Sequence, residues 1–276
     1  MNPEPEPHLA RAAVTDPPGL LVDPSWLKKR VGSPGLRLVD LRDSDAYANG
    51  HIPGAAHLEL ADLGSSVAGL ENVLLPPVEF GDLMATCGIS KGDAVIAYDD
   101  QWGLAAARLV WALHYYGHDG VAVLDGGWDG WQAEGGPSSE GAERITPGRF
   151  EAAPRADVYA DRDSIARRIG SGDAVLLDTR TQTEFDNGHL PGAVCWDWFN
   201  AVPADSWDVS RDPGELRAEW QRLGFNASDE VIVYCRSGMR AAHTYLVLRN
   251  AGFSRVRLYD GSWQEWSMKM GHAGDD

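Results

Sequence analysis

The sequence predicts an α/β protein made of two copies of one unit, each a parallel sheet flanked by helices on both faces. The first observation is an internal repeat, in which LVDLRDSDAYANGHIPGA (residues 38–55) recurs as LLDTRTQTEFDNGHLPGA (176–193). The second is that AVLDGGWDGW (122–131) returns, in the same order along the chain, as RLYDGSWQEW (257–266). The third is the alternation of short apolar runs with Ala/Leu-rich segments of helical length, which indicates parallel strands joined by helical crossovers. We therefore expect two homologous domains.

The repeat and the local composition divide the chain into four parts. Residues 1–19 carry five prolines and few apolar positions, which predicts a loose tail. We expect the first domain at 20–136 and the second at 158–276. Residues 137–157 combine Gly, Pro and Ser without apolar periodicity, so this segment is predicted to be the linker.

Three short apolar runs in each domain close on polar residues, which is the pattern of buried strands. They are residues 36–42, 94–99 and 120–127 in the first domain, and 174–180, 230–235 and 255–261 in the second. A helix is expected between the last two strands of each domain, at 104–117 and at 240–252. Both segments are rich in Ala and Leu, and both end on a glycine, as helices commonly do.

Composition excludes several classes of function. Lys and Arg number 24 against 41 Asp and Glu, and the net charge of −17 repels a nucleic-acid backbone, so no nucleic-acid partner is expected. No apolar run approaches the roughly 18 residues of a membrane span, and no secretory signal is visible. The three cysteines lack CxxC spacing, which argues against a disulfide scaffold or a zinc site. We expect a cytoplasmic protein without metal or cofactor.

The chemistry concentrates where one strand of the second domain ends. The strand at 230–235 closes on a cysteine, and a short loop then enters a helix; its residues are Cys235, Arg236, Ser237, Gly238, Met239 and Arg240. Such a loop points successive backbone N–H groups into one concave nest, and the helix N-terminus adds partial positive charge. This environment would stabilise a thiolate, so Cys235 is the candidate nucleophile and the loop the candidate anion site.

The first domain supplies an internal comparison. It carries Asp99 at the position of Cys235, and an aspartate has no thiol to act as the nucleophile. We therefore expect the first domain to form a wall of the site rather than a second active site. Cys87 and Cys195 have no comparable surroundings and are interpreted as packing residues.

At these residues the chain resembles the tandem-domain rhodanese family, which comprises thiosulfate and 3-mercaptopyruvate sulfurtransferases. The matching features are D-x-R followed by GHIPGA or GHLPGA once per domain, the CRSGMR loop, and the YDGSW segment after the catalytic helix. The resemblance covers residues 20 to 268. It implies two rhodanese-like domains, with the active site between them and the catalytic loop in the second.

The resemblance also implies a double-displacement reaction. The Cys235 thiolate would take the outer sulfur of a small anionic donor as a persulfide and pass it to cyanide or another small thiophile, or to a protein thiol. Arg236 and Arg240 favour thiosulfate as donor, whereas Ser237–Gly238 echoes the mercaptopyruvate enzymes. Those enzymes hold a carboxylate with two arginines; here Arg180 is present, but Glu184 stands where the second would be.

Two more residues enter through the resemblance. Trp263 of YDGSW is the tryptophan most suited to line the pocket. His51 could belong to an Asp–His–Ser relay with Ser237, although the second domain has His189 at the same place, and both histidines could simply brace a turn.

Two other functions stay open. Phosphatases also place a thiolate in an anion cradle, but they need Cys-x5-Arg, and here Ala241 occupies that arginine's position. The second is a persulfide carrier that serves a protein partner without turning over a donor.

Overall fold

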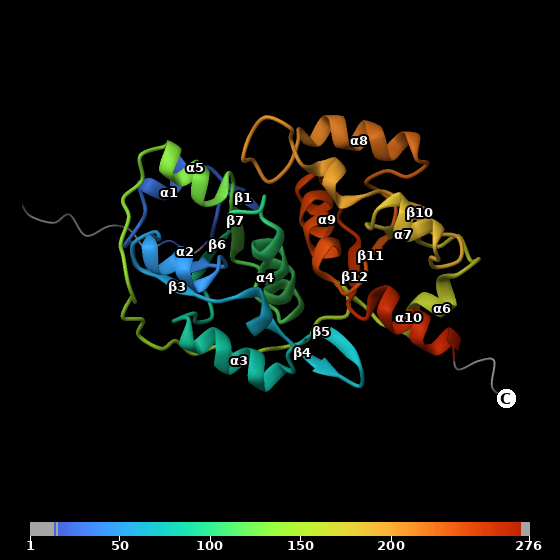
Figure 1. Cartoon of the computed structure of the whole chain (residues 1–276), viewed down its shortest axis with the longest axis horizontal. Coiled ribbons are helices and arrows are strands. Elements are labelled where there is room, and N and C mark those ends of the chain that lie inside the picture. The colour runs from blue at the N-terminus through green and yellow to red at the C-terminus, as the bar shows by residue number, and fades with distance from the viewer. Residues whose placement is uncertain (1–13, 15, 272–276) are drawn as a thin grey trace, which may run out of the picture.

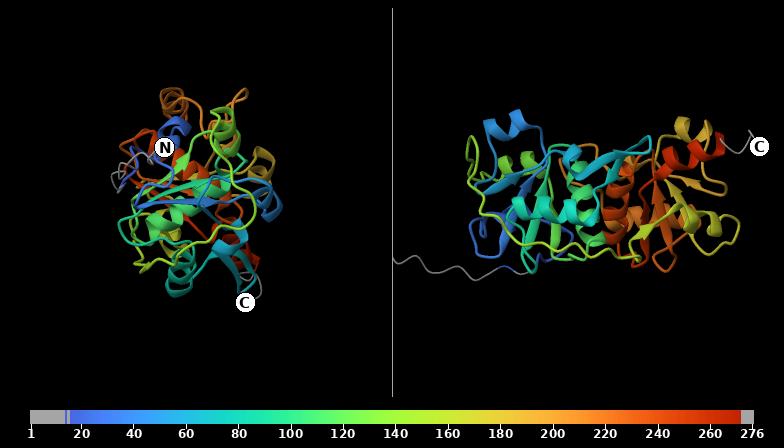
Figure 2. Two further views of the ribbon diagram at one scale, coloured as in Figure 1. Left: turned by 90° about the vertical axis from the view of Figure 1, so that its left-hand side faces the viewer. Right: turned by 90° about the horizontal axis from the view of Figure 1, so that it is seen from below.

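The computed structural model describes residues 14 and 16–271, so the greater part of the predicted tail, 1–13 and 15, lies outside the described residues. Two α/β domains lie side by side along the long axis of the molecule (Figures 1 and 2). Each is built on a five-stranded sheet in which all paired strands are parallel. The expected fold class is confirmed.

The two sheets share one strand order. The first runs β1-β7-β6-β2-β3, and the second, read in the matching direction, runs β8-β12-β11-β9-β10. The first-domain strands are β1 (Leu21–Val22), β2 (Leu36–Asp40), β3 (Ala55–His57), β6 (Ala94–Tyr98) and β7 (Val121–Leu124). Those of the second domain are β8 (Tyr159–Ala160), β9 (Val175–Asp178), β10 (Val194–Cys195), β11 (Val231–Tyr234) and β12 (Val256–Tyr259).

The central strands are apolar on both faces because both faces are covered. In β6, Val95 and Ala97 face a core shared by the two domains, whereas Ile96 and Tyr98 face a core that belongs to the first domain alone. This alternation follows from the two-residue period of a strand. The shared core joins the two domains through one face of each sheet and the helices that cover it.

Helices α4 (Leu104–Tyr115) and α9 (Met239–Asn250) pack against each other at the centre of the interface (Figure 1). Almost every residue of α4 is buried, which explains why its sequence is mostly apolar on every side of the helix. The remaining helices are α1 (Pro24–Lys28), α2 (Ser44–Asn49), α3 (Pro77–Thr86), α5 (Gly127–Ala133), α6 (Arg162–Arg168), α7 (Gln182–Asp186), α8 (Pro213–Arg222) and α10 (Ser262–Gly271), with 3-10 turns η1 (Leu60–Leu63) and η2 (Trp198–Ala201). None of the described helices has the length and apolar character of a membrane span.

The segment predicted as the linker, 137–157, is tied to the first domain by backbone hydrogen bonds. Gly148 N–H donates to the Ala85 carbonyl at 2.8 Å, and Ala153 N–H donates to the Tyr116 carbonyl at 3.1 Å. Closer to its start, Ser139 pairs with His51 in an isolated bridge. The linker therefore adds to the surface of the first domain before the chain enters β8.

One hairpin breaks the symmetry between the domains. Strands β4 (Gly64–Val67) and β5 (Leu70–Leu74) are antiparallel and joined by Ala68 and Gly69, both in the left-handed region at φ 52° and 82°. Two such residues form the tight turn that suits strand twist. The hairpin reaches the second domain, where Gln264 of α10 accepts the Glu71 N–H at 3.0 Å and donates to the Glu71 carbonyl at 2.7 Å.

Candidate active site

Cys235 follows β11 at the carboxyl edge of the second sheet, and its side chain is 1% exposed. Its sulfur accepts the Gly238 N–H at 3.1 Å, the contact that a nest-shaped loop is expected to make. Gly238 is the N-cap of α9 at φ 86°, a conformation that favours glycine. The turn before α10 holds the loop from behind, because the Trp263 N–H donates to the Cys235 carbonyl at 3.0 Å and Ser262 Oγ accepts the Cys235 N–H at 3.2 Å.

Asp99 shows what a loop at this position does to an anion. Its carboxylate is buried and accepts four backbone N–H groups at 2.8–2.9 Å, from Gln101, Gly103, Ala105 and Ala106. Burial raises the pKa of Asp99, and the four donors act against that rise. The first domain thus fills its own cradle with a carboxylate, whereas the second places a sulfur at the equivalent point.

Arg240 does not offer a free positive charge. Its guanidinium binds the Glu184 carboxylate through two hydrogen bonds of 2.6 and 2.9 Å. The pair lowers the pKa of Glu184 to about 2 and raises that of Arg240, to which the nearby Cys235 sulfur also contributes. Arg236 is different: its side chain is 68% exposed and only 4.0 Å from the exposed Glu71. Both arginines of the loop therefore have an acidic neighbour, but only Arg236 keeps a largely exposed side chain.

Arg180 and Trp263 belong to a scaffold that both domains share. Arg180 binds both carboxylate oxygens of Asp178 and the Gly188 carbonyl, and it lies 4.9 Å from the centre of the Trp263 ring. The equivalent set in the first domain is Arg42, Asp40, Gly50 and Trp128. Because the domain without a nucleophile has the same set, its role is to hold the strand ends. The two side chains pack against each other, and Trp263 contacts Cys235 through its backbone.

His51 lies outside the site. Its ring is fully buried in the first domain, with Nδ1 at 2.9 Å from the Tyr47 carbonyl and Nε2 at 3.4 Å from Glu143. His189 makes the same contact with the Phe185 carbonyl at 2.9 Å. Both histidines therefore brace a turn, and the hydroxyl of Ser237 faces Asn72 Nδ2 at 3.5 Å instead of a histidine.

Sequence reasoning missed the first-domain residues that reach the loop. Asn72 of the hairpin and Arg108 of α4 are both next to it, and Arg108 forms a buried ion pair of 2.6 Å with Asp260 of the second domain. The Val67–Leu70 segment signals the hairpin only weakly, because its turn has Ala68 where Asn, Asp or Gly usually precedes the glycine. No sequence signal places it against the other domain.

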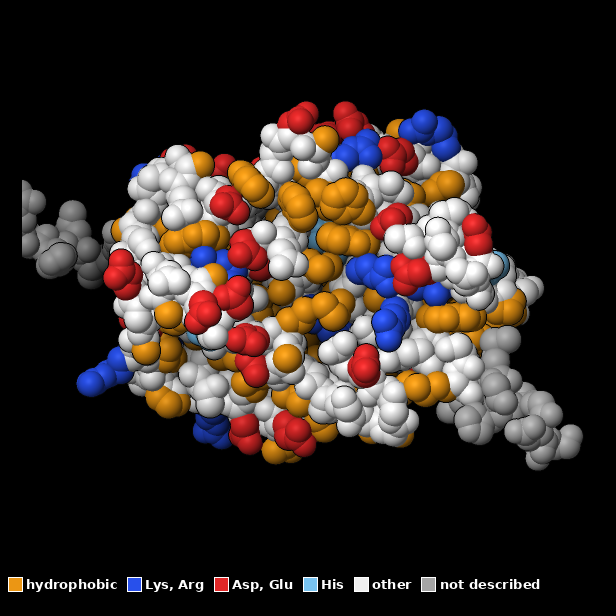
Figure 3. Space-filling model, in the orientation of Figure 1, with side chains coloured by type: hydrophobic (Ala, Val, Ile, Leu, Met, Phe, Trp, Pro, Cys, Tyr) orange, Lys and Arg blue, Asp and Glu red, His pale blue; other side chains and the backbone are white. Residues whose placement is uncertain are grey.

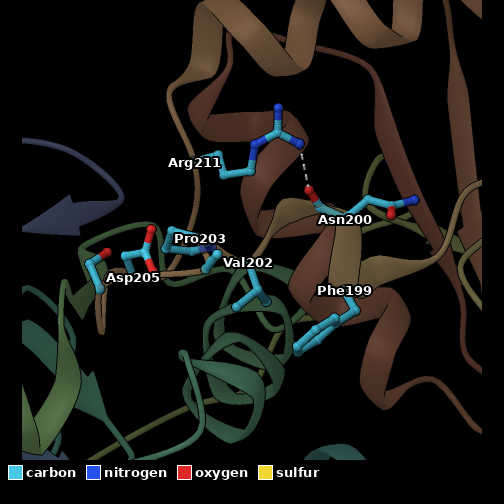
Figure 4. Close-up of a pocket in the computed structure, with 8 residues that line it drawn as sticks. Phe199, Asn200, Val202, Pro203, Asp205 and Arg211 are labelled. Atoms are coloured by element: carbon cyan, nitrogen blue, oxygen red, sulfur yellow. Dashed lines mark hydrogen bonds between the residues drawn. The ribbon is translucent and has the colours of Figure 1, made fainter.

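The visible surface carries acidic side chains over both domains (Figure 3). A group of basic side chains lies over the second domain near the centre of the view, and hydrophobic side chains lie between this group and the acidic side chains of the first domain. Beside η2 lies a hollow of about 520 Å³ lined by residues including Phe199, Val202 and Arg211, which is shown in Figure 4. Its lining includes no residue of the Cys235 loop. Phe199 packs edge-on against Trp102 of the first domain, so this segment closes the interface next to the site.

Comparison with known proteins agrees with this geometry. The rhodanese-like domain model matches residues 23–134 and 161–269. A thiosulfate sulfurtransferase of Corynebacterium glutamicum is 35% identical over 90% of this chain and 88% of its own, and the sulfur carrier protein TtuD of Thermus thermophilus is 31% identical over 92% and 95%. The crystal structure of SseA from Escherichia coli, a 3-mercaptopyruvate sulfotransferase by its description, has a TM-score of 0.81 and 28% identity over 89% of this chain and 99% of that one. The chain therefore belongs to the rhodanese family of sulfurtransferases.

Proposed function

We propose that the protein is a thiosulfate sulfurtransferase in which Cys235 carries the transferred sulfur as a persulfide. The observation that carries the proposal is the Cys235 sulfur at the head of the α9 loop, where it accepts the Gly238 N–H at 3.1 Å. The equivalent loop of the first domain surrounds the Asp99 carboxylate with four such donors, which supports an anion-binding role for amides at this position.

The reaction has two balanced steps. The Cys235 thiolate attacks the outer sulfur of thiosulfate; a new S–S bond forms, the S–S bond of the donor breaks, and sulfite leaves with that bond's electron pair. Cyanide or a thiolate then attacks the terminal persulfide sulfur, and the Cys235 thiolate is regenerated. The backbone amides of the loop, including those of Ser237, Gly238 and Met239, would hold the negative persulfide, while the exposed Arg236 attracts the donor.

Two contacts favour thiosulfate over 3-mercaptopyruvate. A carboxylate is best held by a free, planar arginine fork, and Arg180 has its fork on Asp178. Glu184 occupies the fork of Arg240 in the same way, so neither arginine is free to clamp a substrate carboxylate, while the Glu184 charge repels either donor. Thiosulfate has no carboxylate to clamp. Its reactive sulfur would face the backbone amides of the Cys235 loop, and Arg236 would contact its negative charge.

The test is a comparison of kcat/KM for thiosulfate and for 3-mercaptopyruvate with cyanide as acceptor. We expect the thiosulfate value to be the larger and Cys235→Ala to abolish both, with Cys195→Ser as the matched control that retains them. A larger value for 3-mercaptopyruvate would overturn the choice of donor. Because one relative is named a sulfur carrier protein, the test also has a carrier outcome. Protein that holds one persulfide per chain but turns over neither donor would be a carrier.

A further inference from the structure

Arg108 is a charged residue of the first domain that lies buried under the catalytic loop of the second. It belongs to α4, and its side chain is 2% exposed. Nη2 donates to Asp260 Oδ1 at 2.6 Å and to the Asn72 carbonyl at 2.9 Å. Asp260 is tied to the same hairpin, because its Oδ2 accepts the Leu74 N–H at 3.0 Å. The guanidinium therefore joins α4, the β4–β5 hairpin and the turn after β12.

The other terminal nitrogen of Arg108 has a different environment. Nη1 is buried and has no hydrogen-bond partner among the described residues. A Cβ atom placed on Gly238 would be 2.8 Å from Nη1 and 3.0 Å from Asp260 Oδ1, so the Gly238 backbone lies directly on the ion pair. Gly238 is also the residue whose N–H donates to the Cys235 sulfur.

We propose that Arg108 is a positioning residue for sulfur transfer, through which the first domain holds the Gly238 amide against the Cys235 sulfur. The proposal rests on the function proposed above, in which that sulfur carries negative charge in both chemical states. A donor amide helps only if it stays aligned, and the guanidinium supports the peptide that carries it.

Simple attachment of the two domains would not require this arrangement. A buried ion pair contributes little net stability compared with apolar packing, and the shared core already joins the domains. An attachment role also leaves Nη1 without a function, although a buried, unpaired N–H of a charged group is costly. Support of the Gly238 peptide accounts for the arginine, for the glycine opposite it, and for the direction of Nη1.

The decisive variant is Arg108→Lys. Lysine can keep the ion pair with Asp260, but it cannot extend a second nitrogen under Gly238. Arg42→Lys is the matched control, because Arg42 forms a buried 2.6 Å pair with Asp40 in the first-domain scaffold. The main readout is the rate of Cys235 alkylation by iodoacetamide across pH, located by mass spectrometry, which requires no sulfur donor.

For Arg108→Lys we expect the pH of half-maximal alkylation to rise by about one unit and kcat with thiosulfate to fall about tenfold, while KM changes about twofold or less. Arg42→Lys should keep the wild-type alkylation profile. A wild-type profile and kcat in folded Arg108→Lys, or an equal shift in Arg42→Lys, would overturn the proposal. Arg108→Met, measured on its folded fraction, should show the same shift or a larger one, and no shift there overturns the proposal as well. If wild-type protein turns over no thiosulfate but Arg108→Lys still shifts the alkylation profile, the proposed function fails and the positioning role stands.

Discussion

Replacing Glu184 by Gln would release Arg240 and test how the site selects its donor. Glu184 neutralises Arg240 through two hydrogen bonds of 2.6 and 2.9 Å, and its pKa of about 2 keeps it charged at every working pH. Glutamine keeps the shape of the side chain. It also keeps the capping box with Thr181 at the start of α7, a motif that accepts either residue. The substitution therefore changes charge with little change in local structure.

The size of the effect follows from Coulomb's law. At a separation of roughly 7 Å between carboxylate and bound substrate, and an effective dielectric constant of about 20, each unit of substrate charge is repelled by about 2 kcal/mol. The Glu184 side chain is 34% exposed, and screening by solvent and salt reduces this to about 1 kcal/mol. Removing the charge should then raise kcat/KM about fivefold for monoanionic 3-mercaptopyruvate and about 30-fold for dianionic thiosulfate.

The assay is kcat/KM for both donors at fixed ionic strength, with Glu230→Gln as the control. Glu230 also pairs with an arginine, Arg168, at 3.0 Å, but it precedes β11 and so lies at the opposite end of that strand from Cys235. The control should leave both values within about twofold of wild type. Equal gains for the two donors, or no gain for thiosulfate, would refute the reasoning that Glu184 acts through charge.

Three further predictions concern the loop, its first-domain counterpart and the interface. Gly238→Ala should lose about 2–3 kcal/mol of stability and most activity, because φ is 86° and the new Cβ meets Arg108. In the control Gly252→Ala, φ is 92° but nothing lies within 4 Å of the new Cβ, so denaturant titration should show a loss of about 1 kcal/mol. Equal losses in the two variants would contradict this prediction. Asp99→Asn should lower the melting temperature by leaving some of the four amide donors unpaired, while activity per folded molecule is kept. An unchanged melting temperature would contradict the idea that these four hydrogen bonds stabilise the loop. Burial lowers the pKa of His114 to about 4, from an ordinary value of 6.5, so the unfolded chain binds its proton first and stability is lost as the pH falls from 6.5 to 4. In His114→Gln, about 2 kcal/mol of the stability that the wild type loses between neutral pH and pH 5 should be retained. The same loss in the variant would exclude His114 as its source.

The sequence predicted the architecture well because the repeat and the strand periodicity are local signals. Buried parallel strands such as β6 and β11 need apolar residues on both faces, and a run of consecutive apolar residues in the sequence shows this directly. The position of Cys235 at a strand end before a helix is equally local. Arg180, Trp263 and His51 are residue types that suit a pocket, but in the structure their side chains contact the turns and loops at the strand ends.

By itself, the sequence determined that the chain holds two copies of one α/β unit and that only the second has a cysteine, the candidate nucleophile, at the strand end before its helix. Only the tertiary structure decided the charge at the site, because the pairing of Arg240 with Glu184 and of Arg108 with Asp260 joins residues 56 and 152 positions apart. Such contacts depend on how the sheets place their carboxyl ends and on how the domains pack. Neither arrangement leaves a periodic trace in the chain, since a single charged residue looks the same whether its partner is solvent, substrate or another side chain.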